Sequence, residues 1–279
     1  GFTVAFYIGA LLAPDLNEIF SGFVRILTKP AVLTKDYFFL ELGSISGSCL
    51  NAGIIGTICC AMMFLPGMVA TGTTVAAFFL TAGFCFYGMN PLNLLPFVLG
   101  VFVYSRIKRQ PFAKFVNFAM FSTALAPLIS EVLFRYPGTE THGITLLGVA
   151  LALLIGVVTG CAMPALCAHS PGFHKGYDLY NAGPAAGFLC FLFFAVMYKT
   201  LGIEAPAIAA TLGEGNWAFV NVFCIITFAL CVVAGFFLSG KSFKGYKKVL
   251  MESGHSVDFA SKCGVGPCVM NVGIYGLFI

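Results

Sequence analysis

Long apolar segments, separated by short connections that hold most of the charges, are the feature that most limits what this chain can fold into. A helix needs about 20 apolar residues to cross the hydrocarbon core of a membrane. The segments of about that length are 68–88, 115–134, 144–168, 184–201 and 217–238, and a shorter one is 91–104. Charged residues make up only 9% of the chain, against about 25% in soluble domains. Because lipid tolerates no unpaired backbone groups, we predict an all-α polytopic transmembrane helix bundle with the lipid bilayer as its main partner.

Two further segments need separate treatment. Segment 1–12 is apolar and has neither a basic n-region nor a small-residue cleavage site, so it predicts the remaining part of a transmembrane helix rather than a signal peptide. Segment 48–65 is long enough to cross, but its first half consists of Gly, Ser, Cys and Asn. That composition is also typical of a broken or re-entrant helix, and both interpretations stay open.

Part of the chain has the pattern of an internal duplication. The octapeptide that begins at Phe20 reads F-x-G-[FY]-x-[KR]-[IV]-L, and the octapeptide that begins at Phe243 repeats this pattern 223 positions later. Two later matches keep the same order and nearly the same spacing: 36–37 with 258–259, and the Gly-rich run 47–56 with 266–276. We therefore predict a first transmembrane repeat at 1–240, truncated at its N-terminus, and the start of a second repeat at 241–279, which is cut off.

Loop charges predict the orientation of the chain. Four basic residues, Arg106, Lys108, Arg109 and Lys114, fill one connection and make it cytoplasmic by the positive-inside rule. Counting forward puts the loops of Lys175 and of Lys241 to Lys248 inside, and the loops of Glu140 and of Glu204 and Glu214 outside.

Counting the apolar segments from the Arg106 loop back towards the N-terminus indicates how the two repeats are related. If 48–65 crosses the membrane, the loop that carries Arg25 and Lys35 is outside and its copy near Lys247 is inside, which makes an inverted repeat. If 48–65 is re-entrant, the repeat is parallel. The mixed charges of the first loop, against the basic second loop, favour inversion.

Asn51 and Asn271, which lie in matching Gly-rich runs, are the leading candidates for a binding site. In inverted-repeat transporters the solute binds where discontinuous helices meet, because unwound backbone is tolerated only against protein or a water-filled cavity. Asn supplies a donor and an acceptor, and Gly permits unwinding. The candidate Gly residues are Gly47, Gly53, Gly266 and Gly273. The alternative is close helix packing by small residues, with Asn bonding neighbouring helices together.

The polar run that begins at His174 is the second candidate. Tyr177, Asp178 and Asn181 stand there in an otherwise apolar chain, so they are expected in a cavity or at a membrane interface. An interfacial loop with aromatic residues explains the Tyr residues equally well.

Three runs carry a resemblance to a known family: H-K-G-Y-x-L-Y-N-x-G-x-A-A-G-F from His174, N-P-L-N-L-L-P-F-V-L-G-V from Asn90, and S-G-F-V-R-I-L from Ser21. Together they resemble an uncharacterised bacterial family of polytopic membrane proteins, the domain of unknown function numbered fifteen seventy-six. The resemblance implies a multi-pass protein of the bacterial plasma membrane. It implies no activity and no functional residues.

Several classes of function lack their sequence signals. Cys263 and Cys268 lie five apart near His255, a wider spacing than that of usual zinc sites, so we predict no metal and no cofactor. Nucleophile-elbow, zinc-protease and P-loop motifs are missing, which argues against an enzyme. The basic residues cluster in loops rather than forming a nucleic-acid footprint.

The combined pattern predicts a secondary transporter or channel for a small polar solute. The alternative is a membrane-embedded subunit of a larger enzyme or redox complex, for which the Cys residues inside apolar segments and the aromatic content are weak support. The identity of the solute, any coupling ion, and homo-oligomerisation stay open.

Overall fold

The computed structural model describes residues 1–31, 36–178, 180–205, 217–255 and 257–278. Lys35 and Glu214, two of the loop charges used above to predict orientation, lie outside these residues. The described residues are mostly helical and contain no β-strand. The first helices are α1 (Phe2–Leu12), α2 (Ile19–Thr28), α3 (Ile45–Phe64), α4 (Gly72–Phe84), α5 (Pro91–Ile107), α6 (Val116–Ser122) and α7 (Ala126–Phe134). The remaining helices are α8 (Leu146–His169), α9 (Pro171–His174), α10 (Ala182–Phe194), α11 (Trp217–Leu238), α12 (Lys244–Met251), α13 (Phe259–Cys263) and α14 (Val265–Gly276).

Among the described residues, five apolar helical stretches are long enough to cross a membrane. They are Ile45–Phe64, Phe112–Phe134, Leu146–His174, Ala182–Thr200 and Trp217–Leu238. The chain is therefore a membrane-embedded, all-α helix bundle, as its sequence predicts. The three shorter apolar helices are α1, α4 and α5.

Helix α3 settles one expectation from the sequence, which left two interpretations of segment 48–65 open. The Gly-rich first half is not broken, because α3 runs without interruption through 20 residues and Ser44 caps its start. Its small residues serve close packing against α1. A Cβ at Gly53 would lie 2.7 Å from the Tyr7 ring, and one at Gly56 would lie 2.9 Å from the Thr3 hydroxyl. These contacts also show that α1 and α3 are antiparallel.

Helices α4 and α5 form a hairpin, which corrects a second expectation. The sequence predicts segments 68–88 and 91–104 as separate crossings, but α4 has 13 residues and is only about 20 Å long. It begins just after α3 ends and runs back along α3 until Asn51 contacts residues 85 and 89. The turn at 85–90 is buried, with Cys85 and Met89 0% exposed. The hairpin tip therefore ends inside the protein.

Helix α5 then returns beside α8. Pro96 of α5 lies against Gly156 of α8, and Gly100 lies against Gly160, so the two helices are parallel. The N-terminus of α4 and the C-terminus of α5 consequently lie at the same end of the bundle. We call residues 85–90 the tip of this hairpin.

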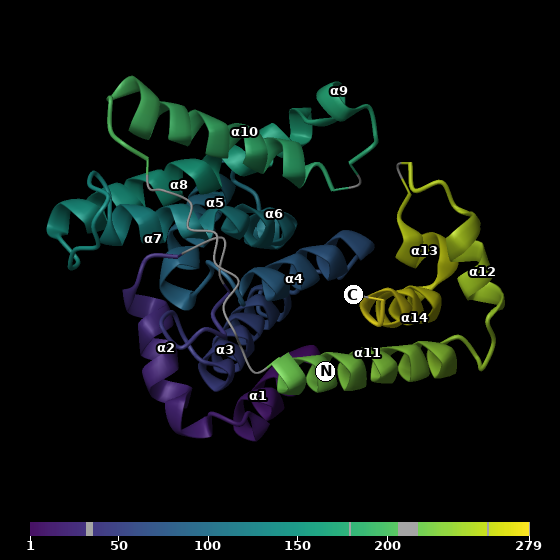
Figure 1. Ribbon diagram of the computed structural model, residues 1–279. Helices are drawn as coiled ribbons and strands as arrows, with labels where there is room; N and C mark the ends of the chain where they lie inside the picture. The colour runs from purple at the N-terminus through teal and green to yellow at the C-terminus, as the bar shows by residue number, and fades with distance from the viewer. Residues whose placement is uncertain (32–35, 179, 206–216, 256, 279) are drawn as a thin grey trace.

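The two ends of the bundle can be named by the amphipathic helices that lie there. Helix α2 contacts the start of α3, because a Cβ at Gly22 would meet the Ser44 side chain. The chain after α12 reaches the opposite end, where a Cβ at Gly72, the first residue of α4, would lie 2.5 Å from Asp258 Oδ1. We call these ends the α2 side and the α12 side. Figure 1 shows α2 and α12 at opposite edges of the molecule.

A second interruption lies in the crossing Phe112–Phe134. The 3₁₀ helix η3 (Thr123–Leu125) separates α6 from α7 in its middle. Pro127, near the start of α7, has no N–H to continue the helical ladder. The break faces α4 and α5, which contact η3 directly.

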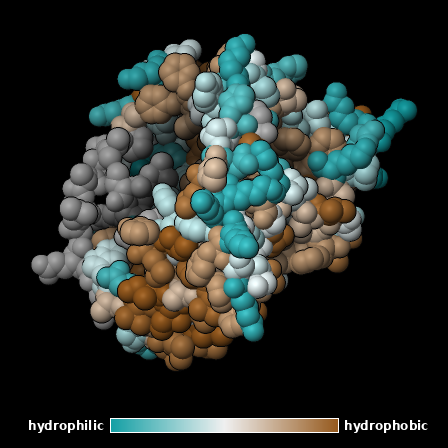
Figure 2. All heavy atoms as spheres, turned by 90° about the vertical axis from the view of Figure 1, so that its right-hand side faces the viewer, coloured by the Kyte–Doolittle hydropathy of each residue, from teal (hydrophilic) through white to brown (hydrophobic). Residues whose placement is uncertain are grey.

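Helices α11 to α14 form a separate group at the right of Figure 1. Helix α14 packs antiparallel on α11, and a Cβ at Gly273 would lie 2.6 Å from the Phe228 carbonyl. Much of α11 presents apolar side chains outward: Val222, Ile225, Ile226, Leu230, Val233, Phe237 and Leu238 are all exposed. Figure 2 shows apolar surface gathered over this lower part of the molecule, as expected of a lipid-facing surface.

Candidate functional site

The hairpin tip is shaped by the sequence around Asn90 and Pro91. Pro91 opens α5, where a missing N–H does no harm. The Asn90 side chain accepts hydrogen bonds from the Leu92 and Asn93 amides, both at 3.0 Å, and the Asn90 amide donates to Asn93 Oδ1 at 2.8 Å. This reciprocal cap occupies the first free N–H groups of α5. Gly88, at φ 86°, takes the left-handed conformation that the turn requires.

Asn51 of α3 holds the tip from one side. Its Nδ2 donates to the carbonyl of Cys85 at 2.7 Å and to the carbonyl of Met89 at 2.9 Å. Both carbonyls belong to the turn, where helical partners are missing. Two acceptors facing one amide require its NH₂ group, so the oxygen Oδ1 must point the other way. Asn51 is 0% exposed.

Asn93 of α5 holds the tip from within. Its Nδ2 donates to the Gly88 carbonyl at 2.8 Å and to Ser130 Oγ of α7 at 2.9 Å. Asn90 Nδ2 donates to the Ile26 carbonyl at 3.0 Å, which joins the tip to α2. Amides from three positions thus supply the donors that the unwound backbone needs in an apolar interior.

The break at η3 lies against α4 and α5 and is also satisfied by side chains. Thr123 Oγ1 donates to the Met120 carbonyl at 2.6 Å, and Ser122 Oγ donates to the Ala119 carbonyl at 2.8 Å. Ser130, which lies inside α7, is the partner of Asn93. The tip is therefore bonded to the helix that follows the break.

Two buried oxygens of α3 have no hydrogen-bond partner among the described residues: Asn51 Oδ1 and Ser48 Oγ. Ser48 is 0% exposed and Tyr37 2%. Ser48 lies three residues before Asn51, on the same face of α3. The Tyr37 amide donates to the Phe86 carbonyl at 2.6 Å, and the Tyr37 hydroxyl interacts with the Gly88 backbone and the Asn90 side chain. We call the turn 85–90, with these three side chains, the tip site.

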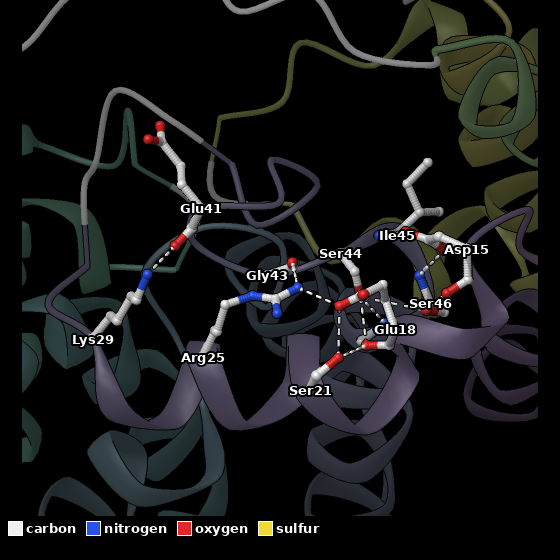
Figure 3. Close-up of polar contacts among 11 residues, drawn as sticks. Asp15, Glu18, Ser21, Arg25, Lys29, Glu41, Gly43, Ser44, Ile45 and Ser46 are labelled. Atoms are coloured by element: carbon white, nitrogen blue, oxygen red, sulfur yellow. Dashed lines mark hydrogen bonds and ion pairs between the residues drawn. The ribbon is translucent and has the colours of Figure 1, made fainter.

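The α2 side holds α3, and therefore Asn51, in position through a polar network (Figure 3). The Asp15 carboxylate accepts from the first amides of α3, at 2.7 Å from Ile45 and 2.9 Å from Ser46. A carboxylate is favourable at a helix N-terminus. Arg25 donates to Glu18 at 2.9 Å and to the Gly43 carbonyl at 2.7 Å, which fixes the chain just before α3.

The predicted Gly residues take part in packing rather than in unwinding. Both α3 and α14 are continuous through them, so the expected broken Gly-rich helices are not found there. A Cβ at Gly47 would lie 2.7 Å from the Phe23 amide, and one at Gly266 would lie 2.6 Å from the Ser239 hydroxyl. Gly53 and Gly273 face Tyr7 and Phe228 in the same way. Backbones this close leave no room for unwound chain and a solute.

Asn271 lies away from Asn51. It is half-buried on α14, which packs against α11, α12 and α13, whereas α3 packs against α1, α2 and α4. The structure brings Asn51 to the tip site together with Asn90 and Asn93. A turn at Asn90 and Pro91 is readable from the sequence, because Pro has no N–H to continue a helix, but the burial of this turn and its bonds to Asn51 are not.

Tyr177, Asp178 and Asn181 lie on the α12 side, after α9. Tyr177 is 86% exposed and stacks edge-on against His255 at 5.3 Å. Asp178 Oδ1 accepts from the Tyr180 amide at 3.2 Å, while its Oδ2 has no partner. Asn181 has φ 61° and precedes α10 without capping it. This loop contacts the α12–α13 connection through a hydrogen bond between His255 Nε2 and the Lys175 carbonyl at 2.9 Å.

No group of three or more His, Cys, Asp or Glu side chains that could hold a metal ion occurs in the part of the chain that the structure describes. No curated protein and no solved structure matches this chain. A family model matches residues 16–199, which run from before α2 to the π-helical segment η4 (Ala195–Thr200) and include the whole tip site. The chain therefore belongs to the family described as Protein of unknown function (DUF1576).

Proposed function

We propose that this protein moves a small polar solute across a membrane and that the tip site binds it. The observation that carries the proposal is the pair of buried oxygens without hydrogen-bond partners, Asn51 Oδ1 and Ser48 Oγ, on the helix that holds a buried, unwound turn. Each buried polar group without a partner costs about 1–3 kcal/mol. A bound solute that supplies the missing partners would recover that free energy.

The buried tip of the hairpin supports transport over a purely structural role. Interrupted helices inside a membrane protein are tolerated where they face protein or a water-filled path, and they are the usual place for substrate and ion sites in transporters. Here the tip bonds α7 through Asn93 and Ser130, and the break at η3 contacts α4 and α5. A stable scaffold alone would not need two such interruptions in neighbouring helices.

The arrangement of the two amphipathic helices supports an inverted repeat. Helix α2 contacts the start of α3 through Gly22, and α12 contacts the start of α14, where a Cβ at Gly245 would lie 2.5 Å from Pro267. Each Gly-rich helix is antiparallel to the long helix before it, yet α2 and the chain after α12 lie at opposite ends of the bundle. We infer that α1–α3 and α11–α14 are inverted copies.

The distribution of charge supports an orientation with the α12 side in the cytoplasm of a bacterial cell. Among the described residues, the α12 side carries ten basic and three acidic side chains, and the α2 side carries four basic and seven acidic ones. The basic residues of the α12 side are Arg106, Lys108, Arg109, Lys114, Lys175, Lys241, Lys244, Lys247, Lys248 and Lys262. This excess agrees with the positive-inside rule.

Osmotic swelling of proteoliposomes tests transport even though the solute is unidentified. Liposomes with and without the purified chain are mixed in a stopped-flow instrument with urea, glycerol, a sugar, a neutral amino acid, NaCl or KCl. We expect faster swelling with the protein for at least one of these solutes. Asn51→Ala should lose this difference. Equal rates with and without correctly folded wild-type protein for the whole panel would contradict the proposal.

A further inference from the structure

We propose that the tip site binds a monovalent alkali-metal cation, held by Asn51 Oδ1 and Ser48 Oγ. The inference rests on the proposed function, because it names the chemical class that occupies the same site. That cation is the transported solute.

The unpaired atoms of the site are acceptors. Asn51 has committed its NH₂ group to the carbonyls of Cys85 and Met89, so only its oxygen is free. Ser48 Oγ, one turn away on the same face of α3, has two lone pairs and no partner. Two neutral oxygens on one helix face suit a hard cation, which prefers oxygen ligands.

The charge of the site limits the cation to one elementary charge. The polar residues buried in the described part of the chain are Ser, Thr and Asn, and none of them is a carboxylate. Ca²⁺ and Mg²⁺ sites rely on carboxylates to balance two charges. A proton is excluded because Asn and Ser do not titrate, and burial raises the pKa of the Tyr37 hydroxyl, which keeps its proton.

Thermal unfolding in different salts tests the inference on the purified full chain. The melting temperature is measured in NaCl, KCl and LiCl, each against choline chloride at equal ionic strength. We expect a saturable rise in melting temperature with at least one alkali cation and none with choline, because a ligand that binds only the folded state stabilises it. Equilibrium binding of radioactive ²²Na⁺, with the other cations as competitors, then gives the affinity and the selectivity.

Ser48→Ala separates binding from structure. Ser48 Oγ makes no hydrogen bond, so the melting temperature in choline chloride should not fall. The cation concentration for half-saturation should rise at least about tenfold. Ser105→Ala is the matched control, because Ser105 is equally buried but bonds only the Phe102 carbonyl of its own helix. It should keep the wild-type response to salt.

The outcomes distinguish the two proposals. If wild-type protein shows no difference between alkali cations and choline, or if Ser48→Ala binds the cation as wild type does, the cation site is wrong. If the cation binds but proteoliposomes show no flux of any solute, transport is wrong and the site is structural. If solutes cross without any cation dependence or binding, transport stands and the cation site fails.

Discussion

At the scale of single residues, Asn51 has a structural task as well as a proposed binding task. It donates to two buried carbonyls that have no other donors among the described side chains. We predict that Asn51→Ala lowers the free energy of unfolding by about 1–3 kcal/mol, because these carbonyls are left unsatisfied. Thermal unfolding in detergent measures the change. Any loss of flux in Asn51→Ala must therefore be compared at equal amounts of folded protein.

Asn271→Ala is the substitution to compare with Asn51→Ala. Its side chain is half-buried and makes no hydrogen bond with the described residues, so Asn271→Ala should leave the melting temperature nearly unchanged. The inverted-repeat hypothesis nevertheless predicts that Asn271→Ala loses flux. Normal flux in that variant would confine the binding site to the first copy.

Glu18, on the α2 side, makes stability depend on pH. A hydrogen bond from Ser21, and then one from Arg25, lower the pKa of Glu18 below its ordinary value of 4.5. A lowered pKa means that the ionised carboxylate stabilises the folded state above pH 4.5, and that this contribution is lost as the pH falls through the folded-state pKa.

The prediction is tested with Glu18→Gln, which cannot ionise. Melting temperatures across the acid range up to neutral pH should converge for the two proteins at the acid end and separate towards neutral pH, with wild type the more stable. Curves that stay parallel over this range would show that Glu18 contributes no such pH-dependent term.

At the scale of helices, contact between α5 and α8 depends on the absence of side chains. A Cβ at Gly160 would meet the Phe97 carbonyl and lie 2.9 Å from the Gly100 Cα. Because backbone cannot move aside as a side chain can, we predict that Gly160→Val separates the two helices and destabilises the fold by about 1–3 kcal/mol or more. Yield of monodisperse protein and its melting temperature report the effect.

Gly83→Ala is the control for that substitution. Gly83 lies in α4, and a Cβ there would meet nothing within 4 Å. Replacing Gly by Ala in a helix with free space stabilises by about 0.5–1 kcal/mol, so the melting temperature should stay equal or rise. If Gly160→Val were tolerated as well as Gly83→Ala, the described contact between α5 and α8 would be wrong.

At the scale of the whole molecule, the excess of basic residues on the α12 side predicts that this side is cytoplasmic. A single Cys at Gln110, in a background without accessible Cys, should react with a membrane-impermeant reagent only after cell lysis. A Cys at Glu140, which is exposed on the α2 side, should react in intact cells. The reverse pattern would invert the proposed topology.

Composition and the lengths of apolar segments were sufficient to predict a helical membrane protein and four of its five candidate crossings. These properties are local, since lipid forces each crossing segment to satisfy its own backbone groups. The packing of one helix against another is not a local property, because it depends on residues that are distant in the sequence. Segment 48–65 looked broken because Gly serves both unwinding and close approach, and only the position of Tyr7 and Thr3 against α3 selects close approach.

Tertiary structure alone decided where the helices are interrupted and what satisfies them. The turn at Asn90 and Pro91 is readable in the sequence, but its burial follows from α4 being too short to cross. Asn51, Asn93 and Ser130 lie on three different helices and meet only after the hairpin has folded back beside α3 and α8. The sequence contains no distances between residues that are far apart along the chain. The Asn51 amide could therefore be predicted as a candidate, but its hydrogen-bond partners and its unpaired oxygen could not.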